Sequence, residues 1–367
     1  MNVLIVFTGP LIFDGINIST IETFEMFEKD DFNIFILSSI SSNDEVVSMY
    51  ENAGCKVIKC EYRKKSTIKY YNLLKKIIKD KSIDLIHVMG NSTTISLELF
   101  AAKKCGVKVR IAHSRNTTCR HKMFNKILRP VFEKSVNYRF ACGRDAGKWM
   151  FRNKEFEIMK NGKKFEKYSF SNENRINYRK QIGATDKELL IGHVGVFNLQ
   201  KNHIFIVEIA KELIRQKANF KIVLVGAGSK RDDIINLVKE LSISEYFVFL
   251  EPTKEINKIL SAMDIMILPS LYEGLPNVVV EWQINGLPCL VSNNVTDECK
   301  INDNVEFLPI DNSLLWAEGI IRMKDRRIYD ESIIKSNLIK NGFDIVNNAR
   351  KLKEIYLKYY KEMKLVK

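Results

Sequence analysis

The stretch Ile267-Leu-Pro-Ser-Leu-Tyr-Glu-Gly-Leu-Pro-Asn-Val-Val-Val-Glu-Trp-Gln-Ile-Asn-Gly-Leu-Pro288 decides the fold. Its apolar start predicts a strand that ends near Leu268 and is followed by a loop. Pro276 suits the first turn of a helix, and Gly286 followed by a proline ends that helix. The order strand, loop, helix, strand is typical of a parallel sheet, in which ligands bind beyond the carboxyl ends of the strands. We therefore expect the loop to face a ligand.

Two carboxylates flank the expected helix start, Glu273 in the loop beside Gly274 and Glu281 about one turn into the helix. Backbone N–H groups of residues 276–279 would point at the same place and hold a phosphate or another anion. A carboxylate suits such a place only if it binds hydroxyl groups, which a ribose or a hexose supplies. The alternative is that Glu273 is a solvated loop acid and Glu281 a surface acid.

A second unit of this kind reads Ile191-Gly-His-Val-Gly-Val-Phe-Asn-Leu-Gln-Lys-Asn-His203. The strand is expected to run to Phe197, and Asn202 to cap a helix that starts near His203. Lys201 then lies at a helix N-terminus, where its charge opposes the helix dipole. Phosphate binding explains this position, and a solvated loop lysine is the alternative.

Glycine-containing loops follow two other strands. Gly226 and Gly228, in Val223-Leu-Val-Gly-Ala-Gly-Ser229, let the backbone approach a ligand or a neighbouring helix closely. Gly15, in the loop after the first strand, is placed to approach the ligand from the other half of the chain. Glycines at such turns also serve packing, so these loops alone do not identify a ligand.

Apolar runs alternate with helical patterns through both halves of the chain. The runs are continuously apolar, as expected for parallel strands that helices cover on both faces. We expect strands at residues 3–7, 32–37, 56–60, 84–89, 109–113 and 138–142, and then at 191–197, 221–225, 247–250, 264–268 and 289–292. The fold class is therefore α/β, with two Rossmann-like, doubly wound parallel sheets.

The length of 367 residues exceeds one ordinary core, so two domains are expected. A polar, turn-rich stretch at residues 158–171 is the expected linker. We place the N-terminal domain at residues 1–165 and the second domain at residues 166–345. Residues 346–367 are expected to continue a helix that packs back toward the first domain, because apolar side chains recur at helical spacing from Phe343 onward.

Composition excludes several classes of protein. No apolar run approaches the roughly 20 residues that span a bilayer, and no basic region precedes the apolar start of the chain, so we expect a cytoplasmic protein. The seven cysteines are odd in number and are expected to be reduced thiols. The five histidines are scattered and no Cys-x-x-Cys pattern occurs, which argues against a zinc site.

The formal net charge of +14 is concentrated between residues 101 and 154, which hold 15 Lys or Arg and two acids, Glu133 and Asp145. Such a surface attracts a polyanion or an anionic membrane. The sequence pI of about 9.3 suggests a nucleic-acid-binding protein as one interpretation. The region lacks a recognition module and regularly spaced stacking aromatics, so we expect no nucleic-acid partner.

Three elements occur in a recognisable order: Gln-Lys-Asn-His at 200–203, Leu-Val-Gly-Ala-Gly at 224–228, and Glu-Gly-Leu-Pro-Asn at 273–277 with Glu281 eight positions after its first glutamate. Together they resemble the enzymes of glycosyltransferase family 4, most closely those that build capsular polysaccharides and exopolysaccharides. The segments at 110–116 and 352–356 also fit, so the resemblance covers nearly the whole chain.

The resemblance implies a GT-B fold, with two domains facing across a cleft, and a retaining transfer of a hexosyl group from a nucleotide sugar, UDP-linked, without a metal or cofactor. Glu273 is then expected to contact hydroxyls of the donor sugar, and Lys201 is expected to contact the diphosphate. His113 of the first domain is expected to approach the sugar from across the cleft. A prepositioned ammonium stabilises the charge that grows on the leaving diphosphate. The expected donor-binding positions are Glu281 on the ribose, the backbone of Gly274, Leu275, Asn277 and Val278, the loops at Gly15, Gly226 and Gly228, and Glu251 to Thr253 at the base.

One position departs from the family pattern. Val196 stands where the family usually has an arginine that shares the charge of the diphosphate. Loss of such a contact costs about 2 to 4 kcal/mol of transition-state stabilisation unless another cation replaces it. A weakly active sugar-nucleotide-binding partner subunit therefore stays open as an alternative. A sugar-nucleotide epimerase is another, because it shares the fold.

In this family the first domain binds the acceptor, and the basic region gains a role from that. Arg120-His-Lys-Met-Phe-Asn-Lys-Ile-Leu-Arg-Pro-Val-Phe132 mixes cations with apolar residues, as an interfacial helix does. We expect residues 101–154 to dock on anionic lipid at the inner face of the cell membrane and to reach a lipid-linked or oligosaccharide acceptor. An ordinary core-facing helix with solvated lysines is the alternative.

Overall fold

The structure is a computed structural model, which describes residues 1–119, 122–253 and 255–365. The chain forms two compact units. The first unit comprises Met1–Lys163 with Gly342–Lys367, and the second unit comprises Lys164–Asn341. The boundary after Lys163 lies inside the stretch that the sequence suggests as a linker, and the returning segment begins at Gly342 rather than at residue 346.

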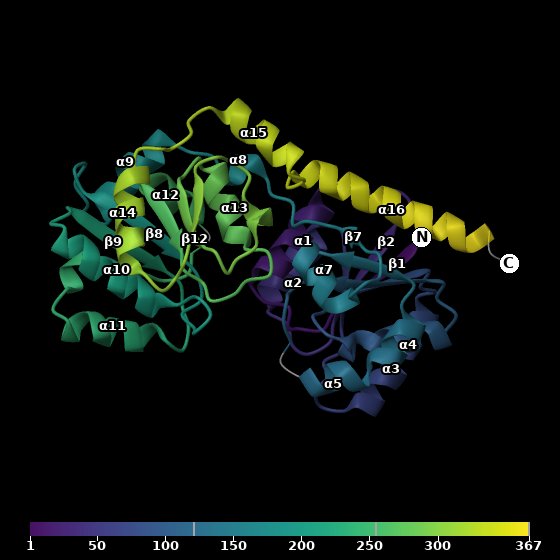
Figure 1. Ribbon diagram of the computed structural model, residues 1–367. Coiled ribbons are helices and arrows are strands. Elements are labelled where there is room, and N and C mark those ends of the chain that lie inside the picture. Colours follow the sequence, from purple (N-terminus) through teal and green to yellow (C-terminus); the bar gives the residue numbers. More distant parts are fainter. Residues whose placement is uncertain (120–121, 254, 366–367) are drawn as a thin grey trace. The chain divides into compact units, whose positions relative to one another are not determined.

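A seven-stranded parallel sheet forms the centre of the first unit, in the order β3-β2-β1-β4-β5-β6-β7 (Figure 1). Its strands are β1 Asn2–Phe7, β2 Asn33–Ser38, β3 Lys56–Lys59, β4 Leu85–Met89, β5 Val109–Ser114, β6 Tyr138–Ala141 and β7 Glu157–Ile158. All five residues of β4 and all but the first of β1 are buried. This double-sided burial is the reason why these runs are apolar throughout.

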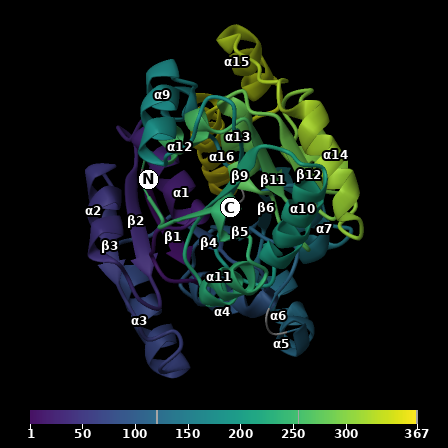
Figure 2. The same cartoon turned by 90° about the vertical axis from the view of Figure 1, so that its left-hand side faces the viewer.

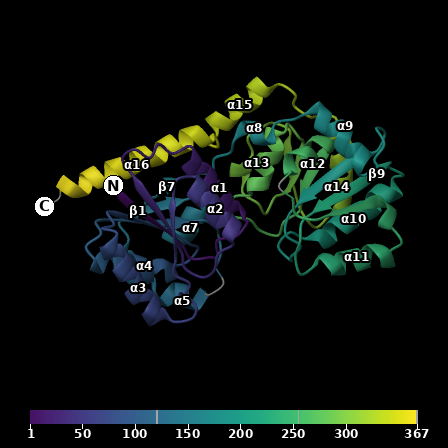
Figure 3. The ribbon, with the colours of Figure 1, turned by 180° about the vertical axis from the view of Figure 1, so that it is seen from behind.

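Helices cover both faces of this sheet. They are α1 Gly15–Glu25, α2 Asp44–Asn52, α3 Thr67–Asp80, α4 Ser96–Lys104 after the 3-10 turn η1 Thr93–Ile95, α5 Lys122–Ile127, α6 Arg129–Ser135, α7 Arg144–Phe151 and α16 Ile345–Leu365. Because side chains alternate along a strand, Val3, Ile5 and Phe7 share one core with α1, α2 and α16. Figures 1 and 3 show α3 and α4 on the face opposite α16.

The predicted return of the C-terminal helix to the first unit is confirmed. α16 contributes Leu352, Tyr356 and Tyr359 to the core of that unit. The ring of Tyr359 stacks on that of Tyr138 with 3.5 Å between centroids. The apolar spacing near the end of the chain therefore marks a helix that completes the core over a sheet whose first strand lies more than 300 residues earlier.

The second unit holds a six-stranded parallel sheet in the order β10-β9-β8-β11-β12-β13. Its strands are β8 Leu189–Val194, β9 Phe220–Val225, β10 Phe247–Leu250, β11 Ile265–Leu268, β12 Cys289–Ser292 and β13 Val305–Leu308. Its helices and 3-10 turns are α8 Phe165–Tyr168, α9 Asn172–Gln181, α10 His203–Arg215, α11 Arg231–Glu240, η2 Ser244–Tyr246, α12 Ile256–Ala262, α13 Asn277–Ile284, η3 Asp297–Cys299, α14 Ser313–Met323 and α15 Glu331–Lys340. Figure 2, seen from the side of this unit, shows α10 and α14 next to each other, where Trp316 of α14 is packed in the core.

Both sheets reverse their strand order at a central pair. In the first sheet the chain moves outward from β1 to β3 and returns to the other side of β1 with β4. In the second sheet the same reversal takes place between the neighbouring strands β8 and β11. Ligands of open parallel sheets bind at such switch points, beyond the carboxyl ends of the two strands. Each unit therefore offers one place of this kind.

The structure adds two strands that the sequence does not predict. β7, with only two residues, lies in the stretch that reads as a linker, and it pairs with β6 at the edge of the first sheet. β13 carries Glu306 and lies at the edge of the second sheet, where it pairs with β12. Short edge strands bury few side chains, so they lack the continuous apolar run that identifies the central strands.

Candidate functional site

Two loops of the second unit meet at its switch point, one after β8 and one after β11. The backbone N–H of Leu271 donates to the carbonyl of Gln200 at 2.8 Å. The side-chain amide of Gln200 donates in return to the carbonyl of Tyr272 at 3.0 Å. The residues that follow the two strands are therefore fixed to each other by backbone contacts.

Lys201 and Glu273 form an ion pair between these loops. Lys201 Nζ lies 2.7 Å from Glu273 Oε1, and the side chains are only 14% and 11% exposed. Ser270 Oγ donates to the same carboxylate oxygen at 2.9 Å. The structure thus brings together the two second-unit residues predicted to be catalytic, and it adds Ser270 as a third member.

The helix α13 begins directly after the Glu273 loop, with Pro276 at its N-cap position and no side-chain cap. Its first turn contains Asn277 and Val278, as predicted, and Glu281 follows on the same helix with partial exposure. An uncapped helix start attracts an anion. Leu275, by contrast, is buried with 8% of its surface exposed.

The glycines after β9 approach the loop after β8. A Cβ atom on Gly226 would lie 2.0 Å from the carbonyl oxygen of Gly195, and one on Gly228 would lie 2.4 Å from that of Phe197. Both glycines have a φ of +152°, which side chains disfavour. Both glycines therefore pack closely against the backbone of a neighbouring loop, and their approach to a donor stays a prediction.

Glu251 and Thr253 follow β10 at the same edge of the sheet. Glu251 is exposed and pairs with Arg231 at 2.9 Å. Thr253 Oγ1 accepts a hydrogen bond from the backbone of Glu255 at 3.1 Å. Their proposed contact with the nucleotide base stays a prediction.

One detail of the predicted loop is wrong. Asn202 occupies the N-cap position of α10 in a left-handed conformation with φ +55°, and its side chain makes no capping hydrogen bond. Asn198 acts instead, since its side-chain oxygen accepts from the N–H of Lys201 at 3.0 Å. Val196, in the same loop, is 56% exposed.

The predicted residues of the first unit are Gly15 and His113. Gly15 starts α1, and the preceding Asp14 caps the helix by accepting from the N–H groups of Ile16 and Asn17. His113 lies in β5 with only 3% of its surface exposed.

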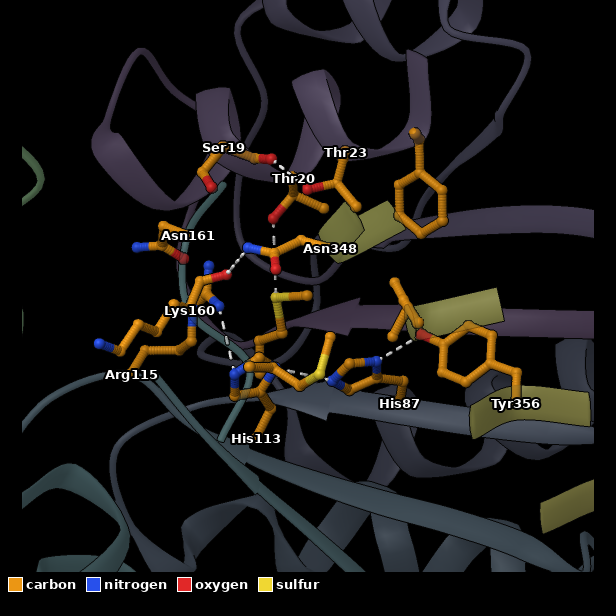
Figure 4. A pocket seen from close by; sticks show the side chains of 14 residues that line it. Ser19, Thr20, Thr23, His87, His113, Arg115, Lys160, Asn161, Asn348 and Tyr356 are labelled. Atoms are coloured by element: carbon orange, nitrogen blue, oxygen red, sulfur yellow. Dashed lines mark hydrogen bonds between the residues drawn. The ribbon is translucent and has the colours of Figure 1, made fainter. Parts of the chain in front are cut away.

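His113 belongs to a chain of four side chains (Figure 4). Arg115 Nη1 lies 3.2 Å from His113 Nε2, and His113 Nδ1 lies 3.0 Å from His87 Nε2. His87 Nδ1 in turn lies 2.6 Å from the hydroxyl of Tyr356 on α16. A guanidinium can only donate, and a neutral imidazole has one donor and one acceptor. Each histidine therefore carries its proton on Nδ1, and both rings are oriented by the neighbours on either side.

Burial keeps these histidines neutral. It lowers the pKa of His87 to about 3, with a further contribution from the charge of Arg115. It lowers the pKa of His113 well below the usual value for the same reasons. In the second unit, burial lowers the pKa of His203 to about 4 and that of His193 well below its usual value.

These depressed pKa values predict a loss of stability in mild acid. Between a folded pKa of about 3 to 4 and the unfolded value near 6.5, the unfolded chain binds protons that the folded chain does not. Stability therefore falls as pH decreases through this window, by about 1 to 2 kcal/mol per histidine between pH 7 and pH 5. Denaturant unfolding at the two pH values measures this, and an unchanged midpoint would contradict it.

The sequence did not single out Arg115, His87, Tyr356 or Ser270. Arg115 follows a predicted strand and His87 lies within one, where a polar residue in an apolar setting is a usable signal. Tyr356 could not be found, because its position in an amphipathic helix gives no hint of a partner 269 residues away.

The basic region 101–154 does not place all of its charge on the surface. Arg110 donates to the carbonyls of Ser135 and Val107, and Arg129 donates to that of Met150. In the predicted interfacial segment, positions 120 and 121 lie outside the described residues. The rest of the segment divides between two helices: none of the residues of α5 is buried, whereas Phe132 of α6 lies in the core.

Among residues 1–119, 122–253 and 255–365, no helix is long and apolar enough to cross a membrane. Nor does this part of the chain gather three His, Cys, Asp or Glu side chains in a way that would hold a metal ion.

Comparison with known proteins gives these sites a context. Residues 174–338 match the family described as glycosyl transferases group 1. Over 375 residues the chain is 27% identical to the UDP-Gal:alpha-D-GlcNAc-diphosphoundecaprenol alpha-1,3-galactosyltransferase of Escherichia coli. This alignment covers 95% of the present chain and 94% of the E. coli protein. The chain is also 29% identical over 269 residues to EpsF of Bacillus subtilis (strain 168), and this alignment covers 70% of each chain. The name of EpsF describes an unproven glycosyltransferase.

Solved structures share the fold over nearly the whole chain. HepE of Anabaena in complex with UDP-glucose has a TM-score of 0.80 at 13% identity, with 98% of this chain and 100% of that chain covered. A glycosyltransferase from Rickettsia africae has a TM-score of 0.80 at 17% identity, with 99% and 98% covered. At these identities the likeness shows the fold alone. With the family match and the named relatives, it makes this chain a glycosyltransferase of the GT-B fold.

Proposed function

We propose that the chain is a retaining glycosyltransferase of family 4, which transfers a hexosyl group from a UDP-linked sugar to a lipid-linked or oligosaccharide acceptor in the synthesis of a surface polysaccharide. The observation that carries the proposal is the Lys201–Glu273 ion pair at the switch point of the second sheet. The relatives support it, since the E. coli protein is named for transfer from UDP-Gal to a diphosphoundecaprenol-linked sugar, and HepE was solved with UDP-glucose.

Lys201 and Glu273 would divide the donor between them. The ammonium meets the diphosphate, where negative charge grows as the sugar leaves, and the carboxylate accepts hydrogen bonds from sugar hydroxyls. Their mutual contact orients both side chains before the donor binds. The uncapped start of α13 adds N–H groups for the phosphates, and Glu281 would accept from the ribose. Transfer in this scheme requires no metal ion.

A thermal-shift screen of nucleotide sugars tests this donor assignment. A ligand present at about 100 times its Kd stabilises the folded chain by about 2.7 kcal/mol. We expect UDP-hexoses to raise the melting temperature more than the free hexoses or the other nucleotide diphosphates. A larger shift with a GDP-linked or ADP-linked sugar would overturn the assignment to UDP.

Val196 offers a gain-of-function prediction. The side chain is 56% exposed in the loop that also contains Lys201. An arginine there would add a second cation for the diphosphate, so Val196→Arg is expected to preserve or raise the affinity for the donor, by up to about 10-fold. The matched control is Val196→Gln, which has similar length and no charge. A clear drop in donor affinity for the arginine variant would count against the proposed position of the diphosphate.

The exposed face of α5 is proposed to dock on anionic lipid at the inner face of the cell membrane. Met123, Phe124 and Ile127 are 66%, 51% and 61% exposed, and the lysines at 122 and 126 are exposed beside them. Apolar side chains with interleaved cations on one short helix fit a lipid surface of negative charge.

Vesicle sedimentation measures this docking. Replacing both lysines by glutamine should weaken binding to acidic vesicles by about 10-fold to 30-fold, since each cation near the surface contributes about 1 kcal/mol. Serine at Met123, Phe124 and Ile127 should weaken binding to acidic vesicles as well. Ile68→Ser on α3, a residue 77% exposed, is the control for the loss of a surface apolar group. Equal binding to neutral vesicles, or none to either kind, would contradict electrostatic docking.

A further inference from the structure

His193, near the end of β8, holds a buried hydrogen-bond acceptor that has no donor. Its side chain is completely buried, and Nδ1 lies 2.9 Å from the carbonyl oxygen of Ile267 on β11. Because a carbonyl can only accept, Nδ1 carries the ring proton and Nε2 offers a lone pair. This lone pair is buried and accepts no hydrogen bond from the residues that the structure describes. A buried acceptor of this kind is costly unless a further donor reaches it.

Gly195 brings this lone pair close to the side chain of Lys201. A Cβ atom on Gly195 would lie 3.0 Å from His193 Nε2 and 3.2 Å from both Cδ and Cε of Lys201. The lone pair and the end of the lysine stem therefore border the same small space, which stays open because residue 195 has no side chain. The ammonium follows directly on Cε and has three N–H donors. A donor-rich group thus lies beside an acceptor that lacks a donor.

The ring of His193 is held in place by two contacts. The first is the hydrogen bond from Nδ1 to Ile267, on the strand that leads into the Glu273 loop. The second is the ring of His203, which packs edge-on with 4.7 Å between centroids and an interplanar angle of 84°. His203 in turn stacks on Phe197 with 4.0 Å between centroids. The direction of the lone pair is therefore fixed.

Both histidines stay neutral beside the lysine. Burial lowers the pKa of His193 well below its usual value, and His203 and the charge of Lys201 lower it further. Burial, with the charge of Lys201, lowers the pKa of His203 to about 4. At neutral pH, Nε2 of His193 is therefore an acceptor and not part of a second cation that would repel the ammonium.

The ammonium of Lys201 has the capacity for a further acceptor. Nζ donates to Glu273 Oε1 at 2.7 Å, and the diphosphate of the donor would accept from a second N–H group. Two acceptors let an ammonium turn about the line that joins them, whereas a third acceptor fixes its position. A charge that is fixed before the reaction stabilises the transition state without reorganisation.

We propose that His193 is a positioning residue for Lys201, whose ammonium donates a hydrogen bond to His193 Nε2 when the diphosphate of the donor is bound. Three acceptors then hold the cation: Glu273, the diphosphate and His193. The inference rests on the proposed function, because it requires that Lys201 meets the diphosphate. It assigns different roles to the two ring nitrogens, since Nδ1 joins two strands through Ile267 and Nε2 serves the lysine.

Two substitutions of His193 separate the roles of the ring nitrogens. Glutamine reaches about as far as Nε2, so His193→Gln keeps an acceptor for the ammonium and loses the bond to Ile267. Asparagine reaches the position of Nδ1, so His193→Asn keeps that bond and leaves no acceptor for the ammonium. Loss of a hydrogen bond from a charged group is expected to cost about 10-fold to 100-fold. We expect kcat for transfer from a UDP-hexose to fall by that factor in His193→Asn, with KM nearly unchanged, and to fall less in His193→Gln. A role in the fold alone would reverse the order of the two variants.

The wild-type chain gives a second readout that needs no substitution of the histidine. Saturation with UDP should shift the imidazole ¹⁵N resonance of His193 Nε2, because this nitrogen gains a hydrogen bond from the ammonium. Uridine, which lacks the diphosphate, should not shift it. In Lys201→Met, UDP at a saturating concentration should leave the resonance unchanged.

Three results would overturn the inference. One is a kcat for His193→Asn equal to or above that of His193→Gln. Another is an unchanged Nε2 resonance in the wild type saturated with UDP. The third is the same shift in Lys201→Met, which would assign the new hydrogen bond to another donor. A wild type that does not bind UDP would refute the proposed function and this inference together, whereas UDP binding without the shift would refute the inference alone.

Discussion

Replacing Lys201 by methionine is expected to lower kcat/KM for glycosyl transfer by about 100-fold to 1,000-fold. The ammonium lies 2.7 Å from Glu273 Oε1, with only 14% of the lysine side chain exposed. Its contribution grows as charge develops on the leaving diphosphate, and such prepositioned groups contribute about 2.7 to 4 kcal/mol to the transition state. Methionine is close to lysine in length, and it removes the charge together with the hydrogen bond to Glu273. Most of the loss should therefore be in kcat.

Lys211→Met is the matched control for this variant. Lys211 is an exposed lysine of the neighbouring helix α10, and it pairs with Glu208 at 2.9 Å. It loses the same charge without any contact to the proposed site, so its kinetic constants should stay close to those of the wild type. An active Lys201→Met enzyme would remove Lys201 from the mechanism.

Gly226→Ala should destabilise the second unit by about 3 to 5 kcal/mol. The new Cβ would lie 2.0 Å from the carbonyl oxygen of Gly195, a backbone atom that cannot rotate away. The φ of +152° adds strain for any residue with a side chain. The loop after β8, which contains Lys201, must move to relieve this contact. Donor binding should therefore fall together with stability.

Gly183→Ala separates the two causes. Gly183, also in the second unit, has a positive φ of +65° but no atom within 4 Å of an added Cβ. Only the conformational strain applies there, at about 1 kcal/mol. Urea unfolding of the wild type, Gly226→Ala and Gly183→Ala measures the loss of stability in each variant. Similar midpoints for the two alanine variants would show that the contact with Gly195 is relieved easily.

The central strands and the second-unit site could be predicted because their signals are local. A buried parallel strand requires a continuous apolar run, and Glu273, Glu281 and Lys201 each follow such a run at the carboxyl end of a strand. The ion pair between Lys201 and Glu273 joins residues 72 positions apart, and it follows from the sheet topology once the strands are placed. Local patterns do not predict the edge strands β7 and β13, because these strands are too short to produce an apolar run.

The first-unit site could not be predicted in the same way, for a physical reason. His113 was selected through family resemblance, yet its ring nitrogens bond to Arg115 and His87. The identity of these neighbours depends on the register between β4 and β5, which pairs His87 with Ile111 and leaves the two histidine rings on one face. Tyr356 joins them through the return of α16. Contacts of this kind are tertiary, and no periodicity in the sequence encodes them.

The most direct test of the proposed function is transfer itself, followed by the configuration of the product. The purified chain is incubated with a UDP-α-hexose and a diphosphate-linked lipid acceptor, and the new glycosidic bond is assigned by NMR. The proposed function predicts an α-linked product, formed without added metal and lost in Lys201→Met. A β-linked product, or a requirement for a divalent metal ion, would contradict it.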